Sequence, residues 1–148
     1  MAGWTLDLDK WAEKQKSDML DVKRTFALKV FTKVIERTPV DSGAHRQNWL
    51  VTINQESFEY DPSLQDGKSD RVNAQARSKV LGSKPGDTII LQNNGPAIRK
   101  LEYGGYGPNS PTGKTVGGFS KQAAQGMVGI TMAEEGAIYT ESVNEVKQ

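Results

Sequence analysis

The feature that most constrains the fold is an apolar stripe at helical spacing between about residue 9 and residue 37. Its members recur three or four positions apart, or two turns apart, with charged residues between them: Trp11, Met19, Val22, Phe26, Val30 and Val34. Further apolar residues widen the stripe in its second half, so we expect that half to be the more buried one. The residue before a proline resists helical geometry, and Pro39 therefore ends the helix. The sequence predicts one long N-terminal helix, with Asp7 or Asp9 as its cap.

The same helix carries a basic edge made of Lys29, Lys33 and Arg37, at a spacing of four. Such an edge can face a polyanion, but a solvated face is the preferred interpretation. Over the whole chain, 19 Lys and Arg residues balance 18 Asp and Glu residues, so no overall positive field attracts nucleic acid or anionic lipid. A DNA-reading module is therefore disfavoured.

Two strands and a helix are predicted in the middle of the chain. Apolar and polar residues alternate in NWLVTIN, residues 48–54, which is typical of a half-buried strand. DTIILQNN, residues 87–94, is the second strand. Between them, residues 70–81 form an amphipathic helix, with a Ser69 or Asp70 cap and Gly82 beyond its end.

The remainder is predicted as a short helix within residues 94–105, long loops at about 55–69 and 104–122, and a C-terminal helix over residues 122–147. Because two strands are too few for independent stability, one or two more are expected within 55–68 or 104–120. The order of elements predicts a single α+β domain over residues 1–148. Its long N-terminal helix and its C-terminal helix are expected to pack on one face of a small, mainly antiparallel sheet.

The segment YGPNSPTGKT, residues 106–115, resembles the end of a phosphate-binding loop but is interpreted as an irregular surface loop. Gly113, Lys114 and Thr115 match the pattern, whereas Pro108 stands where the first glycine belongs. Proline also removes amide donors from a loop that must present them. A nucleotide-binding enzyme that uses TGKT is the less favoured alternative, and it requires nucleotide binding that Lys114→Ala abolishes.

We expect no catalytic residue, no cofactor and no metal. The chain has no cysteine and a single histidine, His45, and its acidic loop lacks the ligand spacing of a calcium site. His45 is interpreted as a surface or hydrogen-bonded histidine, and Trp49 as a core residue. No apolar run reaches the length that a membrane span needs.

Three stretches, taken together, resemble the tail-component proteins of long-tailed bacteriophages, also called tail-completion or neck proteins. They are RTPVDSGAHRQNW (37–49), NNGPAIRKLEYGG (93–105) and QAAQGMVGITMAE (122–134). The family pattern has a T-P-V-D-T-G segment followed by an arginine and a Ser/Asn-Trp pair, then N-N-x-P and L-E-Y-G, and finally G-M-V in a helix. The matching residues here are Thr38, Pro39, Val40, Asp41, Ser42, Gly43, Arg46, Asn48, Trp49, Asn93, Asn94, Pro96, Leu101, Glu102, Tyr103, Gly104, Gly126, Met127 and Val128.

The resemblance implies a virion structural protein without catalysis, assembled in the host cytoplasm and located in the tail or neck of the particle. It implies a ring, a hexamer by the symmetry of such tails, that joins the tail to the head. Its expected partners are further copies of itself, a tail terminator or tail tube protein, head–tail connector proteins, and DNA that passes through the lumen without sequence readout. A tail terminator or a head-side connector protein is the alternative within the same class.

Six residues are candidates for contacts with neighbours: Asp41, Arg46, Glu102, Tyr103, Tyr106 and Phe119. We hypothesise that Arg46 and Glu102 pair and so join the first two stretches. The 104–122 loop, anchored by Tyr106 and Phe119, is hypothesised to be mobile in the free subunit and to become ordered against a neighbour.

Overall fold

The computed structural model describes residues 2–107 and 111–148, with side chains from residue 7 onward. The elements are α1 (Ala2–Arg37), α2 (Ala44–Gln47), β1 (Trp49–Ile53), α3 (Asp70–Leu81), β2 (Ile89–Asn93), α4 (Ile98–Tyr103), β3 (Thr115–Val116), β4 (Phe119–Ser120), the 3-10 turn η1 (Lys121–Ala123), α5 (Val128–Met132) and α6 (Glu135–Lys147). The predicted mixed α+β class, with a long N-terminal helix, a C-terminal helix and a small antiparallel sheet, is confirmed.

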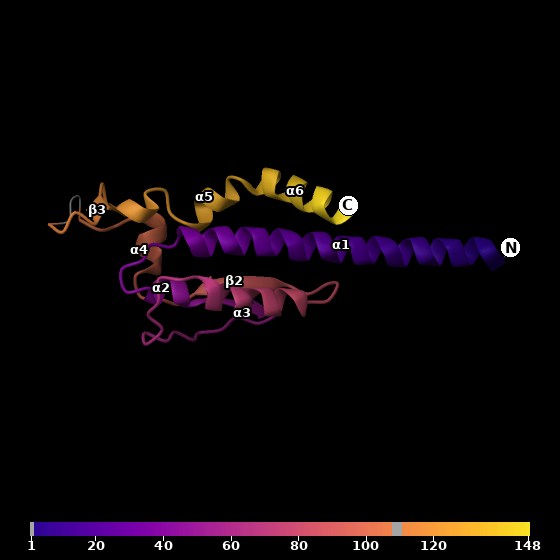
Figure 1. Ribbon diagram of the computed structural model, residues 1–148, viewed down its shortest axis with the longest axis horizontal. Coiled ribbons are helices and arrows are strands. Elements are labelled where there is room, and N and C mark those ends of the chain that lie inside the picture. The colour runs from indigo at the N-terminus through magenta and orange to yellow at the C-terminus, as the bar shows by residue number, and fades with distance from the viewer. Residues whose placement is uncertain (1, 108–110) are drawn as a thin grey trace.

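The long helix α1 is the rod on which the other elements are mounted (Figure 1). Helices α5 and α6 lie along one side of its C-terminal half, while α3 and the β1–β2 sheet lie on the other side (Figure 1). The predicted packing of both terminal helices on one face of the sheet is therefore wrong, because α1 lies between α6 and the sheet. Helix α6 runs antiparallel to α1, since Glu134 meets Lys33 whereas Glu145 meets Lys29. The N-terminal part of α1 extends beyond all of these elements (Figure 1).

Helix α1 begins earlier than predicted. It starts at Ala2, so Asp7 and Asp9 lie inside the helix and neither caps it. Residues 4–12 contain neither glycine nor proline, and nothing in that stretch stops the helix from continuing toward the N-terminus.

The predicted pair of strands is confirmed as an antiparallel ribbon in which Trp49 lies opposite Asn93 and Ile53 opposite Ile89. A two-stranded ribbon is marginal alone, and α3 packs against β1 to support it. The Gln75 side chain of α3 accepts a hydrogen bond from the Val51 amide (3.3 Å) and donates to the Val51 carbonyl (3.2 Å). A helix side chain thus forms the hydrogen bonds that the Val51 amide and carbonyl need at the free edge of the strand.

The additional strands were expected within 55–68 or 104–120. A small hairpin, β3 paired with β4, lies in the second range, while residues 55–68 contain no strand. The 55–69 loop is held by side chains instead. The Asn48 side chain donates to the Asp61 carbonyl and accepts from the Asp61 backbone amide, both at 2.8 Å. The Gln47 side chain donates to the Asp66 carbonyl at 3.0 Å.

The single C-terminal helix predicted over residues 122–147 is wrong, because the segment divides into η1, α5 and α6. Gly126 has φ +80°, a left-handed conformation that interrupts a right-handed helix. The core lies between α1, α3, β1 and the C-terminal segment, and its least exposed apolar side chains are Val34, Ile35, Val51, Val72, Val80, Met127 and Ile138.

Candidate functional site

The three stretches that carry the resemblance meet at one corner of the molecule. We call this region the corner; it comprises residues 37–49, 93–105 and 122–134, which include the end of α1, α2, the adjoining ends of β1 and β2, α4 and α5. Within it, the side chains of Trp49, Asn93 and Glu102 each form a hydrogen bond with a residue outside their own helix or strand. Segments up to 97 residues apart in the chain are therefore neighbours there.

Thr38 and Trp49 form the buried centre of the corner. The Thr38 hydroxyl donates to the Val34 carbonyl at 2.8 Å and accepts from the Trp49 indole N–H at 2.6 Å. Both residues are buried, so the prediction of Trp49 as a core residue is confirmed. The indole has its polar partner inside the fold, as buried tryptophan usually requires.

Arg46 does not pair with Glu102, and that hypothesis is wrong. Its guanidinium donates to three backbone carbonyls, those of Glu36 (2.8 Å), Thr38 (2.8 Å) and Gly67 (2.7 Å). The last carbonyls of a helix lack intrahelical partners and favour a cation, and α1 ends at this point. Arg46 therefore fixes the 55–69 loop to the end of α1.

Glu102 instead receives the first amides of the α5 segment. Its carboxylate accepts from the amides of Met127 (2.8 Å), Val128 (2.9 Å) and Gly129 (2.7 Å). These donors have no intrahelical partner, and a carboxylate is a strong acceptor for them. Sequence reasoning placed Glu102 and the G-M-V stretch in separate signatures and missed that the first caps the second.

His45 joins the first stretch to the second. Its Nε2 accepts from the Ala97 amide at 3.2 Å, and its carbonyl accepts from the Asn93 side chain at 2.6 Å. A β-carbon added to Gly95 would lie 2.6 Å from His45 Cδ2, so glycine is needed at this contact. Burial lowers the pKa of His45. The prediction of a hydrogen-bonded histidine is confirmed.

A cavity of about 630 Å³ lies between the Asp41 turn and the β3–β4 hairpin. Asp41, His45, Leu101, Tyr106, Lys114 and Gln122 are among its lining residues. Lys114 Nζ lies 2.7 Å from Asp41 Oδ1 in an exposed ion pair, and this hydrogen bond and the lysine charge lower the pKa of Asp41. Strand β3 begins at Thr115, where a phosphate-binding loop would begin its helix.

The aromatic candidates occupy three different environments. Tyr103 is 75% exposed on α4. Tyr106 is half-buried against the core, with Lys100 Nζ 5.5 Å from the centre of its ring. Phe119 is half-buried in β4, close to Gly104. Residues 108–110 of the predicted 104–122 loop lie outside the described residues.

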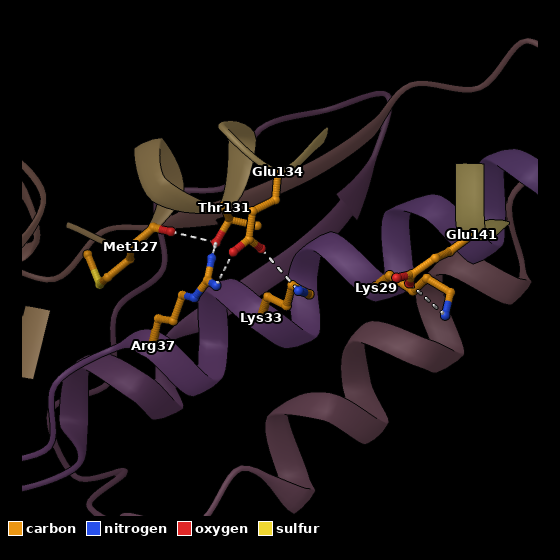
Figure 2. A network of polar contacts seen from close by, with 7 residues as sticks. All are labelled: Lys29, Lys33, Arg37, Met127, Thr131, Glu134 and Glu141. Carbon is orange, nitrogen blue, oxygen red and sulfur yellow. Dashed lines mark hydrogen bonds and ion pairs between the residues drawn. The ribbon is translucent and has the colours of Figure 1, made fainter. Parts of the chain in front are cut away.

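The basic edge of α1 is covered by acidic side chains of the C-terminal segment, so the prediction of a solvated face is wrong. Glu134 bridges Lys33 (3.0 Å) and Arg37 (2.8 Å), and Lys29 lies 3.0 Å from Glu145 and 3.9 Å from Glu141. Figure 2 shows the two Glu134 pairs and the Lys29–Glu141 pair along the helix. Arg37 and Lys33 lower the pKa of Glu134. A polyanion would have to displace these internal partners.

The Arg37 guanidinium also donates to Thr131 Oγ1 at 2.8 Å, and that hydroxyl donates to the Met127 carbonyl at 2.7 Å (Figure 2). Thr131 is fully buried. The network thus links the end of α1 to α5 inside the fold.

Neither a protein-family model, nor a curated protein, nor a solved structure matches this chain.

Among the described residues, no group of three or more His, Asp or Glu side chains is placed to hold a metal ion. No helix within that part of the chain is long and apolar enough to cross a membrane.

A second region of interest is the projecting part of α1. Trp11 is 62% exposed and Met19 is 71% exposed, although both belong to the apolar stripe that continues into the core. A groove of about 620 Å³ lies beside Met19, where α6 runs along α1. The periodicity of the sequence identified the stripe but did not indicate where its covering helix ends.

Proposed function

We propose that this chain is a virion structural protein of a long-tailed phage, a tail-completion or neck protein that forms a ring at the head-proximal end of the tail and joins the tail to the head. The observation that carries the proposal is the convergence of the three resembling stretches at the corner. Their polar groups bind one another, as Glu102 binds the Met127 amide and His45 binds the Ala97 amide. A chain with the architecture of the tail-completion family is expected to hold its three signature stretches together as one structural unit.

The roles of these side chains favour a building block over a chemical site. The charged side chains of Arg46 and Glu102 form hydrogen bonds with backbone groups of their own chain. A general acid or base needs a reacting group within hydrogen-bond reach and a shaped pocket around it. Here Arg46 and Glu102 serve to fix a loop and a helix start.

The projecting part of α1 is a second argument for the proposed assembly with other chains. Large apolar side chains that gather on one exposed face commonly mark an interaction surface. Trp11 and Met19 have this placement. The proposed partners are further copies of the chain, a tail terminator or tail tube protein, and head–tail connector proteins, with DNA passing through the lumen without sequence readout.

Two measurements test the proposal together. Native mass spectrometry and negative-stain electron microscopy of the purified protein are expected to find a closed ring, a hexamer by the symmetry of such tails. Peptide mass spectrometry of purified particles from the phage that carries the gene is expected to detect the chain. An inert monomer that is absent from particles would refute the proposal. Cryo-electron microscopy of those particles would separate a neck position from that of a terminator or a head-side connector.

A further inference from the structure

The face of α1 that packs against α6 continues uncovered toward the N-terminus. Phe26 is within the covered part, since its ring meets that of Tyr139 edge-on at a centroid distance of 6.2 Å. Positions three or four residues apart share a helix face, as do positions two turns apart. The apolar residues on this face, from covered to uncovered, are Phe26, Val22, Met19, Trp11 and Leu8. An established interface within the chain thus extends beyond the helix that covers it.

A groove marks the place where this cover ends. It has a volume of about 620 Å³, and its apolar walls are Met19, Val22 and Phe26 from α1 and Tyr139, Val143 and Val146 from α6. Its lining also contains three lysines, Lys14, Lys23 and Lys147, against one carboxylate, Asp18, which gives a net charge of +2 (3 − 1). Lys23 donates to the Asp87 carbonyl, a neutral acceptor, and the nearby Asp87 carboxylate offsets part of its charge.

The segment immediately N-terminal to the groove has the complementary character. Residues 7–13 carry Leu8 and Trp11 as apolar side chains, with three carboxylates and one lysine, which gives a net charge of −2 (1 − 3). A helix rises 1.5 Å per residue, so Trp11 lies roughly 12 Å along the axis from Met19. The segment belongs to the same rigid helix and cannot fold back into its own groove.

We propose that the groove of one copy receives residues 7–13 of a second copy. Leu8 and Trp11 fill the apolar walls, and the acidic side chains of the segment face the lysines of the groove. Tryptophan is among the residues that most often dominate the binding energy of an interface. Each copy has one such segment and one such groove, so the contact forms a two-fold pair where it is reciprocal, or a ring where it runs head to tail with a rotation that closes. The inference deepens the proposed function, because it names the surface through which copies of the chain contact one another. It rests on the proposed function in one respect, namely that the chain associates with itself.

Trp11→Ala tests the contact directly. Alanine favours helix, and Trp11 is mostly exposed, so the variant keeps the fold, as circular dichroism would verify. Phe58→Ala is the matched control, since Phe58 is also an exposed aromatic residue (87%) but lies in the 55–69 loop. Sedimentation velocity from micromolar to millimolar concentration is expected to find association in the unchanged protein and in Phe58→Ala. In Trp11→Ala the dissociation constant is expected to rise about tenfold or more.

Photo-crosslinking identifies what occupies the groove. A photoreactive phenylalanine at position 11 is expected to crosslink to peptides that contain Tyr139, Val143 or Val146. Mixing isotope-labelled and unlabelled copies shows whether the two peptides come from different chains. A purely monomeric protein, association that Trp11→Ala leaves unchanged, or crosslinks only to other surfaces would each overturn the inference.

The two proposals fail in different ways. If particles contain the chain and Trp11→Ala still forms the assembly, the proposed function stands and the groove contact is wrong. If Trp11→Ala abolishes association but purified particles lack the chain, the contact stands and the phage function is wrong.

Discussion

Glu102 occupies the space that a side chain at position 126 would need. A β-carbon added to Gly126 would lie 2.6 Å from the Glu102 carbonyl oxygen and 3.0 Å from its Oε1 atom. The 2.6 Å distance is shorter than real β-carbons show to heavy atoms, so the L-E-Y-G stretch and the G-M-V stretch depend on each other. The glycine lets the carboxylate reach the amides at the start of α5.

Gly126→Ala is expected to destabilise the fold by about 2 kcal/mol or more, because it adds left-handed strain at φ +80° to the clash with Glu102. Gly136→Ala is the matched control, since nothing lies within 4 Å of its added β-carbon and it is in helix α6. That variant is expected to gain about 0.5 kcal/mol from helix propensity. Urea unfolding measures both. Equal midpoints for the two variants would contradict the proposed fit of Glu102 against Gly126.

Glu102→Gln is expected to lower the free energy of unfolding by about 1–3 kcal/mol. In the unchanged protein three backbone N–H groups donate to the two charged oxygens of the carboxylate, whereas glutamine offers a single neutral acceptor oxygen. Glu135→Gln removes the same charge from an exposed residue at the start of α6 and is expected to change stability by less than about 0.5 kcal/mol. Thermal unfolding by circular dichroism compares the two. Loss of α5 packing in Glu102→Gln should also raise amide exchange at residues 127–129, which a uniform charge effect would not do.

Much of the fold follows from local pattern. The helix over 70–81 is seen as Asp70–Leu81, and the two strands appear in their predicted places, because spacing at 3.6 and 2 residues reports directly which face is buried. The break near Gly126 depends on Glu102, a residue far away in sequence, and no local pattern contains that information. Secondary structure near the corner was therefore the least predictable part.

The candidate site shows the same division. The sequence correctly identified Trp49 as core and His45 as hydrogen-bonded, since each follows from the nature of one side chain and its element. Arg46 was paired with Glu102 by charge, whereas both found stronger partners in the unpaired backbone groups at helix ends. The basic edge of α1 was likewise misread, because its acidic partners come from α6 and from Glu134 just before it, and the sequence did not reveal the path of this segment.

The Glu134 bridge predicts a specific acid sensitivity. Arg37 and Lys33 hold the pKa of Glu134 below its ordinary value of 4.5. A carboxylate with a depressed folded-state pKa contributes stability that is fully present above the unfolded value and is lost as the pH falls through the folded value. The Tm difference between the unchanged protein and Glu134→Gln is thus expected to be largest above about pH 4.5 and to shrink as the pH falls below that value.

Asp41, Asp61 and Asp87 also have lowered pKa values, so the unchanged protein and Glu134→Gln should both lose stability in acid. The difference between the two curves isolates the bridge. Glu135→Gln serves as the control, because Glu135 is the next residue along but lies outside the bridge to Lys33 and Arg37. A Tm difference for Glu134→Gln that stays constant across this pH range would show that the bridge adds nothing measurable.

Lys114 offers a test of the phosphate-loop alternative. Its partner in the structure is Asp41, and the two side chains are 63% and 83% exposed, so the pair lies where water and salt screen it. Lys114→Ala and Asp41→Asn are expected to leave the urea midpoint nearly unchanged, because exposed pairs contribute little to stability.

Isothermal titration of the unchanged protein with ATP or GTP and magnesium is expected to give no binding. The segment leads from Lys114 into a strand, whereas phosphate binding requires a loop that leads into a helix N-terminus. Nucleotide binding that disappears in Lys114→Ala and persists in Asp41→Asn would reverse this interpretation and favour an enzyme.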